Sequence, residues 1–333
     1  MARDDLFDRK ARVVPAGAHV HPPPMINRTM GGSEWSSLLL LGLIWGGAFF
    51  FIDVAVAEVA PLTFVWARLS IAAAVLWLYL WARGRLPKLP RGALGAMLLL
   101  ALLNNAVPFT LFAWSQTHID GGLSSILNAT SPIWTVLVAH VATHDERMTP
   151  GKIAGVLLGF AGVIAMIGPD LLTTLGNQAL AQLAALAGAF CYALAGVWAR
   201  RFRVMNIPPA SVAAWQLAAA AGMMAPVALV ADRPWNAAMP SLQAWSAILA
   251  LAIVCSAFAY ILYFRIIDRA GATNALLVTL LTPPVAIALA ALFLDEQLGM
   301  QHFVGLGLVA LGLAAIDGRL LSAARPLVLR RAT

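Results

Sequence analysis

The sequence predicts an all-α integral membrane protein whose ten transmembrane helices form a five plus five inverted repeat. Hydrophobic residues make up 61% of the 333 residues and charged residues 11%, with a mean hydropathy of +0.82, whereas soluble domains contain about 25% charged residues. The chain also matches itself at an offset of 150 residues, as between Gly121 and Gly271 or Gly162 and Gly312. Because each repeat unit holds an odd number of spans, the two halves have opposite orientations in the bilayer.

The termini outside the repeat are predicted to be cytoplasmic tails. Residues 1–34 mix arginines with aspartates, continue into a His/Pro stretch and lack the apolar core of a signal peptide. We therefore expect a disordered tail, within which translation could also begin at Met25 or Met30. Residues 319–333 form a basic tail.

Ten segments between the tails are long and apolar enough to cross the hydrocarbon core, which takes about 20 helical residues. The spans are expected at Trp35–Val56, Pro61–Trp81, Gly92–Ser115, Leu123–Val141, Gly151–Ile167, Ala179–Ala199, Pro208–Val230, Leu242–Phe264, Thr273–Leu294 and Phe303–Ile316. The first five spans make a repeat over residues 35–168 and the last five a repeat over residues 179–318.

The basic residues predict the orientation of these spans. Of the 22 lysines and arginines, all but Arg68 and Arg233 fall in the tails and in the loops on the same side as the tails. The positive-inside rule then places both termini in the cytoplasm. We expect a multi-pass protein of the bacterial inner membrane. The formal charge of +7 is interpreted as a topology signal and not as a nucleic-acid surface.

Polar and aromatic side chains deep in the spans are the candidates for a binding site, because buried polar groups need a partner or water. The candidates are Trp45, Asn104, Asn105, Asn128, Ser131, Tyr192, Gln216, Tyr260 and Thr279. Adjacent asparagines project about 100° apart on a helix, so Asn104 and Asn105 do not both face lipid. They either join helices by hydrogen bonds or line a cavity. Trp45 either packs against the following glycines or forms a cavity wall, and Tyr192 is its approximate counterpart in the second half.

A helix break is expected in the fourth span. Pro132 lacks a backbone N–H group, which frees the carbonyl of Asn128. Pro283 and Pro284 are expected to break the ninth span in the same way, one residue out of strict repeat register. Such breaks are either structural kinks or parts of a binding site, since transporters bind substrates at broken helices of matching depth.

Three ionisable residues are candidates for ion coupling or pairing. Asp53 and Arg68 both fall in the outer third of the membrane and could form an ion pair. Alternatively, Arg68 binds a backbone carbonyl or a substrate carboxylate, and Asp53 is a proton site. His140 lies near the cytoplasmic end of the fourth span, where it needs no function or takes part in proton coupling.

The chain resembles the EamA branch of the drug/metabolite transporter superfamily over about residues 35–318. The resemblance is carried by the run ending in Trp45, the opening of the second span from Pro61 to Arg68, the fourth span from Ser124 to Pro132, and the acidic pair before the Gly155/Gly159/Gly162 helix. It implies a secondary transporter similar to bacterial exporters of amino acids and metabolites, including the aromatic amino-acid type. It also implies that spans 1 to 4 and 6 to 9 line a central cavity while spans 5 and 10 pack at the periphery.

A cavity with aromatic walls and amide groups suits apolar or aromatic amino acids and equally suits amphipathic drugs. We expect small-molecule substrates and the bilayer as partners, a monomer or weak homodimer, and no cofactor, metal, nucleic acid or catalytic residue. Cys191 and Cys255 lack a metal or redox spacing, and no nucleotide-binding loop is present. The alternatives are an intramembrane enzyme acting on a lipid-linked substrate, with His118 and Asp120 as its polar pair, and a receptor-like protein.

Overall fold

The computed structural model describes residues 32–142, 150–167, 177–270, 278–294 and 299–317, and the regular structure in these ranges is entirely helical. The first half contains α2 (Gly32–Val56), α3 (Pro61–Ala82), η1 (Arg91–Ala93), α4 (Leu94–Ala101), η2 (Leu102–Ala106), α5 (Val107–Ser115), α6 (Gly121–Asn128), α7 (Ser131–Ala142) and α8 (Pro150–Ile167). The second half contains α10 (Asn177–Val204), α11 (Pro209–Ala231), η3 (Pro234–Asn236), α12 (Leu242–Leu249), η4 (Ala250–Phe258), α13 (Ala259–Ala270), α15 (Val278–Phe293) and α16 (Met300–Asp317).

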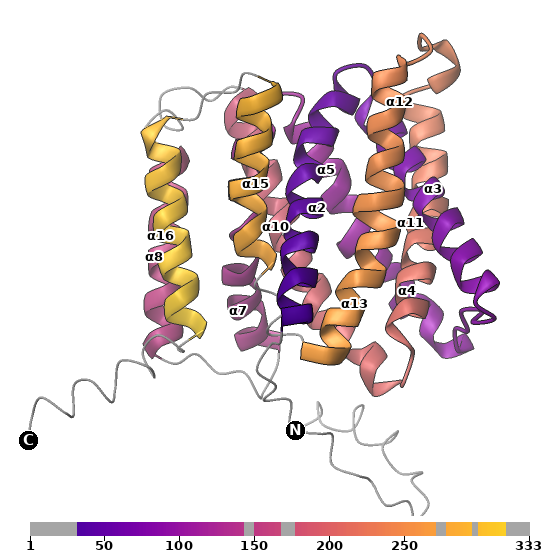
Figure 1. Ribbon diagram of the computed structural model, residues 1–333, viewed down its shortest axis with the longest axis horizontal. Helices are drawn as coiled ribbons and strands as arrows, with labels where there is room; N and C mark the ends of the chain where they lie inside the picture. Colours follow the sequence, from indigo (N-terminus) through magenta and orange to yellow (C-terminus); the bar gives the residue numbers. More distant parts are fainter. Residues whose placement is uncertain (1–31, 143–149, 168–176, 271–277, 295–298, 318–333) are drawn as a thin grey trace, which may run out of the picture.

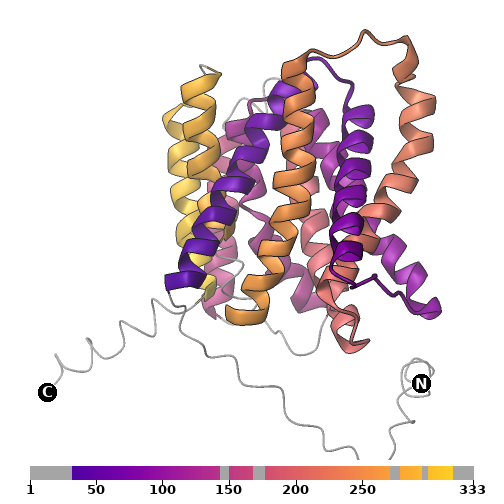
Figure 2. The same ribbon diagram turned by 45° about the vertical axis from the view of Figure 1, so that its right-hand side comes forward.

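Seven of the described helical segments are long and apolar enough to cross a membrane, and three shorter apolar helices accompany them. The three shorter segments are Ile153–Ala165, Leu281–Phe293 and Met300–Gly312. The helices stand side by side (Figures 1 and 2), with α8 and α16 paired at one edge of the bundle. The expected all-α membrane class is therefore confirmed. Helix α2 begins at Gly32, three residues before the expected first span.

Two wide helical turns occupy matching places in the two halves. Both η2 and η4 are π-helical, and residues 102–106 of η2 correspond to residues 252–256 within η4 at the repeat offset. In η4, the hydroxyl of Ser256 donates a hydrogen bond of 2.9 Å to the carbonyl of Leu251, five residues earlier. π-Turns interrupt the regular α-helical bonding and are frequent at functional sites. The backbone distortion thus repeats even though the side chains there differ.

The expected break in the fourth span is present, whereas its expected mate is not. Helix α6 ends at Asn128 and α7 begins at Ser131, whose hydroxyl donates a bond of 2.6 Å to the Asn128 carbonyl. By contrast, α15 continues through Pro283 and Pro284. This part of α15 lies directly against α2, where Val285 meets Gly46, so the prolines stand in a helix that is packed on a neighbour.

Glycines allow two pairs of helices to approach closely. In α2, a Cβ atom added to Gly46 would lie 2.5 Å from the Val285 Cβ of α15. In α16, a Cβ on Gly312 would lie 2.6 Å from the Gly155 carbonyl oxygen of α8, and one on Gly162 of α8 would lie 2.7 Å from the Gly305 carbonyl oxygen. Small residues let membrane helices pack at short distance. The close packing expected for the last span of each half is confirmed, and these two spans pack against each other.

The two halves are also tied at one end of the bundle by two carboxylates. Asp232, which follows α11, accepts a bond of 2.7 Å from the backbone N–H of Thr63 in the first turn of α3. Glu58, in the connection between α2 and α3, accepts bonds from the Ser241 backbone N–H at 2.7 Å and from its hydroxyl at 2.6 Å. Ser241 is the N-cap of α12. Each half therefore caps a helix of the other, which satisfies N–H groups that the helix itself leaves unpaired.

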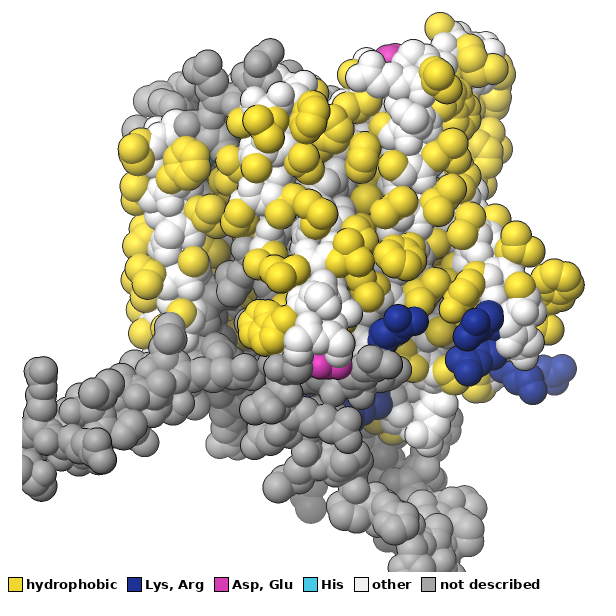
Figure 3. Space-filling model, in the orientation of Figure 1, with side chains coloured by type: hydrophobic (Ala, Val, Ile, Leu, Met, Phe, Trp, Pro, Cys, Tyr) yellow, Lys and Arg dark blue, Asp and Glu magenta, His cyan; other side chains and the backbone are white. Residues whose placement is uncertain are grey.

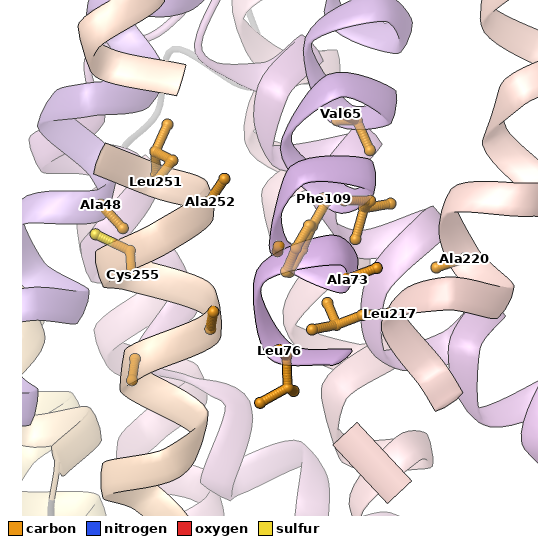
Figure 4. Packing of buried hydrophobic residues seen from close by; sticks show 14 of the residues in the cluster. Ala48, Val65, Ala73, Leu76, Phe109, Leu217, Ala220, Leu251, Ala252 and Cys255 are labelled. Atoms are coloured by element: carbon orange, nitrogen blue, oxygen red, sulfur yellow. The ribbon is translucent and has the colours of Figure 1, made fainter. Parts of the chain in front are cut away.

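Most of the described basic side chains gather at the opposite end, where α3, α10 and α13 finish (Figure 3), whereas Arg68 is buried in the bundle and Arg233 precedes η3 at the capped end. The main apolar core lies between α2, α3, α11 and the α12 to α13 segment. Figure 4 shows Ala48 facing Cys255 across α2 and η4, with Leu217 of α11 beside Ala73 of α3. This core places the two π-helical turns next to helices of the other half.

Candidate functional site

Amide and phenol groups from both halves meet at the η2 turn. The Asn104 amide nitrogen lies 3.2 Å from Gln216 Oε1 of α11 and 3.4 Å from the Tyr260 hydroxyl oxygen of α13. The Asn105 amide nitrogen lies 3.3 Å from the same hydroxyl. Both asparagines therefore join the first half to the second. Four candidates predicted from the sequence form one cluster.

Arg68 of α3 lies beside this cluster and is only 6% exposed. Its Nε donates a hydrogen bond of 3.2 Å to the Ser256 hydroxyl of η4, and its guanidinium lies 4.1 Å from the centroid of the Phe109 ring. A cation over an aromatic ring is attracted by the electrons of the ring face. Titratable neighbours of this guanidinium are Cys255, Tyr192 and Tyr260.

The ion pair considered for Asp53 and Arg68 is not formed. Arg68 turns toward Ser256 and Phe109, whereas Asp53 lies with Gln116 at the end of the bundle that the two carboxylate caps occupy. In the amide orientation that satisfies its neighbours, the Gln116 nitrogen donates to Asp53 Oδ1 and to the Phe49 carbonyl, each at 3.0 Å. The two charges face different neighbours because α3 presents Arg68 to η4 and not to α2.

The oxygen of the Asn105 side chain is the least satisfied polar atom of the cluster. Asn105 is fully buried, and its Oδ1 has no hydrogen-bond partner among the described residues. Buried amide oxygens in folded proteins nearly always accept a hydrogen bond. An acceptor is therefore available here to a donor that the described residues do not supply.

Aromatic side chains flank the cluster on two sides. The Trp45 indole N–H donates a bond of 3.2 Å to the Cys255 carbonyl in η4, and its ring lies 5.3 Å from that of Tyr263. Tyr192 stacks on Phe112, with ring centroids 5.9 Å apart. Trp45 and Tyr192 thus hold different aromatic partners, although repeat counting paired them.

The remaining sequence candidates lie away from the cluster. Asn128 and Ser131 hydrogen-bond to each other at the α6/α7 break. Thr279 is the second residue of α15, and His140 is an exposed residue near the end of α7. An apolar cavity of about 350 Å³ adjoins the break and is lined by Ala129, Pro283, Pro284, Phe303, Leu306, Gly307, Val309 and Ala310.

A second cavity, of about 380 Å³, opens beside Asp53. It is lined by Asp53, Gln116, Thr117, His118, Ile119, Asp120 and Leu294. His118 and Asp120, the polar pair of the alternative enzyme interpretation, line this cavity. Within the described ranges, no group of three or more His, Cys, Asp or Glu side chains is placed to hold a metal ion.

Sequence reasoning named the polar members of the cluster but missed Phe109. The Arg68 guanidinium lies over the Phe109 ring. Phe109 follows Asn105 by four residues, so Phe109 and Asn105 lie on one helix face. That spacing was the available signal. The Cys255 backbone carbonyl in η4 accepts a hydrogen bond from Trp45. The pattern of side chains in the sequence does not predict this bond.

Comparison with known proteins gives matches along most of the chain. The model of a family described as the EamA-like transporter family matches residues 34–168 and 179–316, once in each half. The chain is 22% identical to the uncharacterized transporter YoaV of Bacillus subtilis, over 83% of this chain and 94% of that protein. It is 25% identical to the uncharacterized inner membrane transporter YedA of Escherichia coli, over 88% and 94% of the two chains.

The chain is also similar to a relative whose name includes a substrate and to a solved structure. The chain is 28% identical to a "Probable terminal-alkyne amino-acid exporter" of Streptantibioticus cattleyicolor, over 87% of this chain and 95% of that protein. One solved crystal structure is similar in fold, with a TM-score of 0.60 and 20% identity over 85% of this chain and 97% of that one. The names of these relatives are those of transporters and not of enzymes.

Proposed function

This chain belongs to the EamA-like transporter family, and we propose that it is a secondary transporter that exports small metabolites, most of all amino acids. One observation carries the proposal. A partly buried cluster of Asn104, Asn105, Gln216 and Tyr260, with the buried Arg68 beside it, joins the two halves at π-turns that occupy matching positions. Polar groups inside a membrane bundle mark substrate pathways.

The proposed architecture has ten spans in two inverted halves, with both termini in the cytoplasm of a bacterial inner membrane. The seven long apolar helices and the three shorter ones would together make these ten spans. The gathering of described lysines and arginines at one end of the bundle supports the orientation. The name of the Escherichia coli relative supports the membrane.

Alternating access would follow from rocking of one half against the other around the cluster. At the end of the bundle where Glu58 and Asp232 cap helices, rocking would separate these carboxylates from the helices of the opposite half. Deeper in the bundle, it would act on the close contact between α2 and α15. Paired π-turns provide matched points where helix geometry departs from the α-helix.

The test is counterflow into proteoliposomes loaded with each of the twenty L-amino acids, with and without a proton gradient. We expect saturable exchange of at least one amino acid, and no dependence on ATP. Asn105→Ala should reduce the flux severalfold. Asn236→Ala, in the exposed η3 turn, is the matched control and should leave it unchanged. Absence of saturable flux for all amino acids, in correctly folded protein, would contradict the proposed function.

Export of amphipathic drugs is the second candidate function. The observation that favours it is the aromatic flank, in which Trp45 packs on Tyr263 and Tyr192 stacks on Phe112. Aromatic faces accept apolar and cationic groups without requiring a carboxylate. Ethidium efflux from the same proteoliposomes tests this candidate. Ethidium flux without amino-acid flux would decide in its favour.

A further inference from the structure

The positive charge of Arg68 has no carboxylate partner among the described residues. A guanidinium carries five N–H donors, and here one of them, on Nε, is used in a hydrogen bond, to the neutral Ser256 hydroxyl. The Phe109 ring and the two tyrosine hydroxyls are neutral as well. Burying a charge without a counter-charge is unfavourable. The surroundings of Arg68 are therefore complementary to an anion that the described part of the chain does not provide.

Arg68 and the unsatisfied Asn105 oxygen lie at the same interface between helices. Asn105 and Phe109 are four residues apart in the η2 to α5 segment, and Ser256 and Tyr260 are four apart in the η4 to α13 segment. Residues at this spacing share a helix face. Arg68 contacts Phe109 on one face and Ser256 on the other, while Asn105 reaches Tyr260 across the same interface.

The two bonds from the asparagines to Tyr260 at this interface are long. Both asparagine nitrogens lie 3.3–3.4 Å from the Tyr260 oxygen, beyond the usual range of about 2.7–3.2 Å for N–H to oxygen bonds. Such bonds are weak and can be exchanged for stronger bonds to a ligand. The guanidinium donors that the described residues do not use, together with the Asn105 Oδ1 acceptor, can form these stronger bonds to a ligand.

We propose that Arg68 binds the carboxylate of the transported molecule and that Asn105 Oδ1 accepts a hydrogen bond from its ammonium group. This inference rests on the proposed function and names its substrate class. The ligand is a zwitterionic α-amino acid, bound across the interface between the halves. Guanidinium and carboxylate form paired, charge-assisted hydrogen bonds, which recognise the carboxylate by geometry as well as by charge.

The first test uses the unaltered protein and a matched set of competitors. The amino acid with the highest counterflow is compared with its amide, its decarboxylated amine and its deaminated acid, which share one side chain. We expect the amide and the amine to compete about 10- to 100-fold more weakly than the amino acid, because a hydrogen bond to a charged group is lost. The deaminated acid should also compete more weakly than the amino acid, because it lacks the ammonium group that donates to Asn105 Oδ1. An amide that competes as well as the amino acid would overturn the assignment of Arg68, although transport itself would stand.

The second test uses variants of the anchor. Arg68→Gln should lower amino-acid flux about 10- to 100-fold and abolish the preference for the amino acid over the amide, and Arg68→Lys should retain part of that preference. Arg91→Gln, at the exposed first residue of η1, is the matched control and should behave as the unaltered protein. Unchanged discrimination in folded Arg68→Gln would also overturn the inference. If no amino acid is transported by the unaltered protein, the proposed function fails first, so the two failures are distinguishable.

Discussion

Substitution of Gly46 by alanine tests the contact between α2 and α15 most directly. An added Cβ would lie 2.5 Å from the Cβ and 2.6 Å from the Cγ1 of Val285, and 2.9 Å from the Thr282 carbonyl oxygen. Carbon atoms in favourable contact are about 3.5–4.0 Å apart, so the helices would have to separate by about 1 Å. Overpacking of this kind costs about 1–3 kcal/mol.

Gly222→Ala in α11 is the matched control, because a Cβ there meets no atom within 4 Å. Both substitutions gain the same helix propensity, about 0.5–1 kcal/mol, so their difference isolates the clash. We expect Gly46→Ala to be less stable than Gly222→Ala by about 1–3 kcal/mol. The measurement is the free energy of unfolding from SDS titration in mixed micelles. Equal stability of the two variants would refute the close approach of α2 to α15.

Two further predictions concern the polar contacts between the halves. The Ser241 hydroxyl and backbone N–H lower the pKa of Glu58 below its ordinary value of 4.5. This stabilisation is therefore complete above pH about 4.5 and is lost as the pH falls through the lower folded-state value. The stability difference between the unaltered protein and Glu58→Gln, followed by unfolding from pH 7 to pH 3, should shrink with acidification, and a constant difference would exclude this linkage. Trp45→Phe keeps an aromatic ring but removes the donor to the Cys255 carbonyl, so it should cost about 0.5–1.5 kcal/mol against about 3–5 kcal/mol for Trp45→Ala, measured by the same titration; unchanged stability of Trp45→Phe would show that the hydrogen bond contributes nothing.

The helices, and the close packing of the last helix of each half, were predictable from the sequence. Hydropathy and length identify membrane spans because every backbone polar group in lipid must be bonded within the helix. The glycines of α8 and α16 predicted a close contact, and the structure pairs these helices through Gly162 and Gly312. The Asn128 break followed from Pro132. Its expected mate at Pro283 did not appear, and α15 continues through this proline against α2.

That this chain crosses a membrane, repeats, and buries a few polar residues follows from hydropathy and spacing, which are properties of the chain alone. Which of those polar residues meet depends on the packing of the helices. Arg68 turned to Ser256 and Phe109 and not to Asp53, since partners depend on how each helix is rotated and which helix lies beside it. The matching η2 and η4 turns also emerged only in three dimensions. Their residues differ, so the symmetry of the site lies in backbone geometry while its chemistry comes from unequal halves.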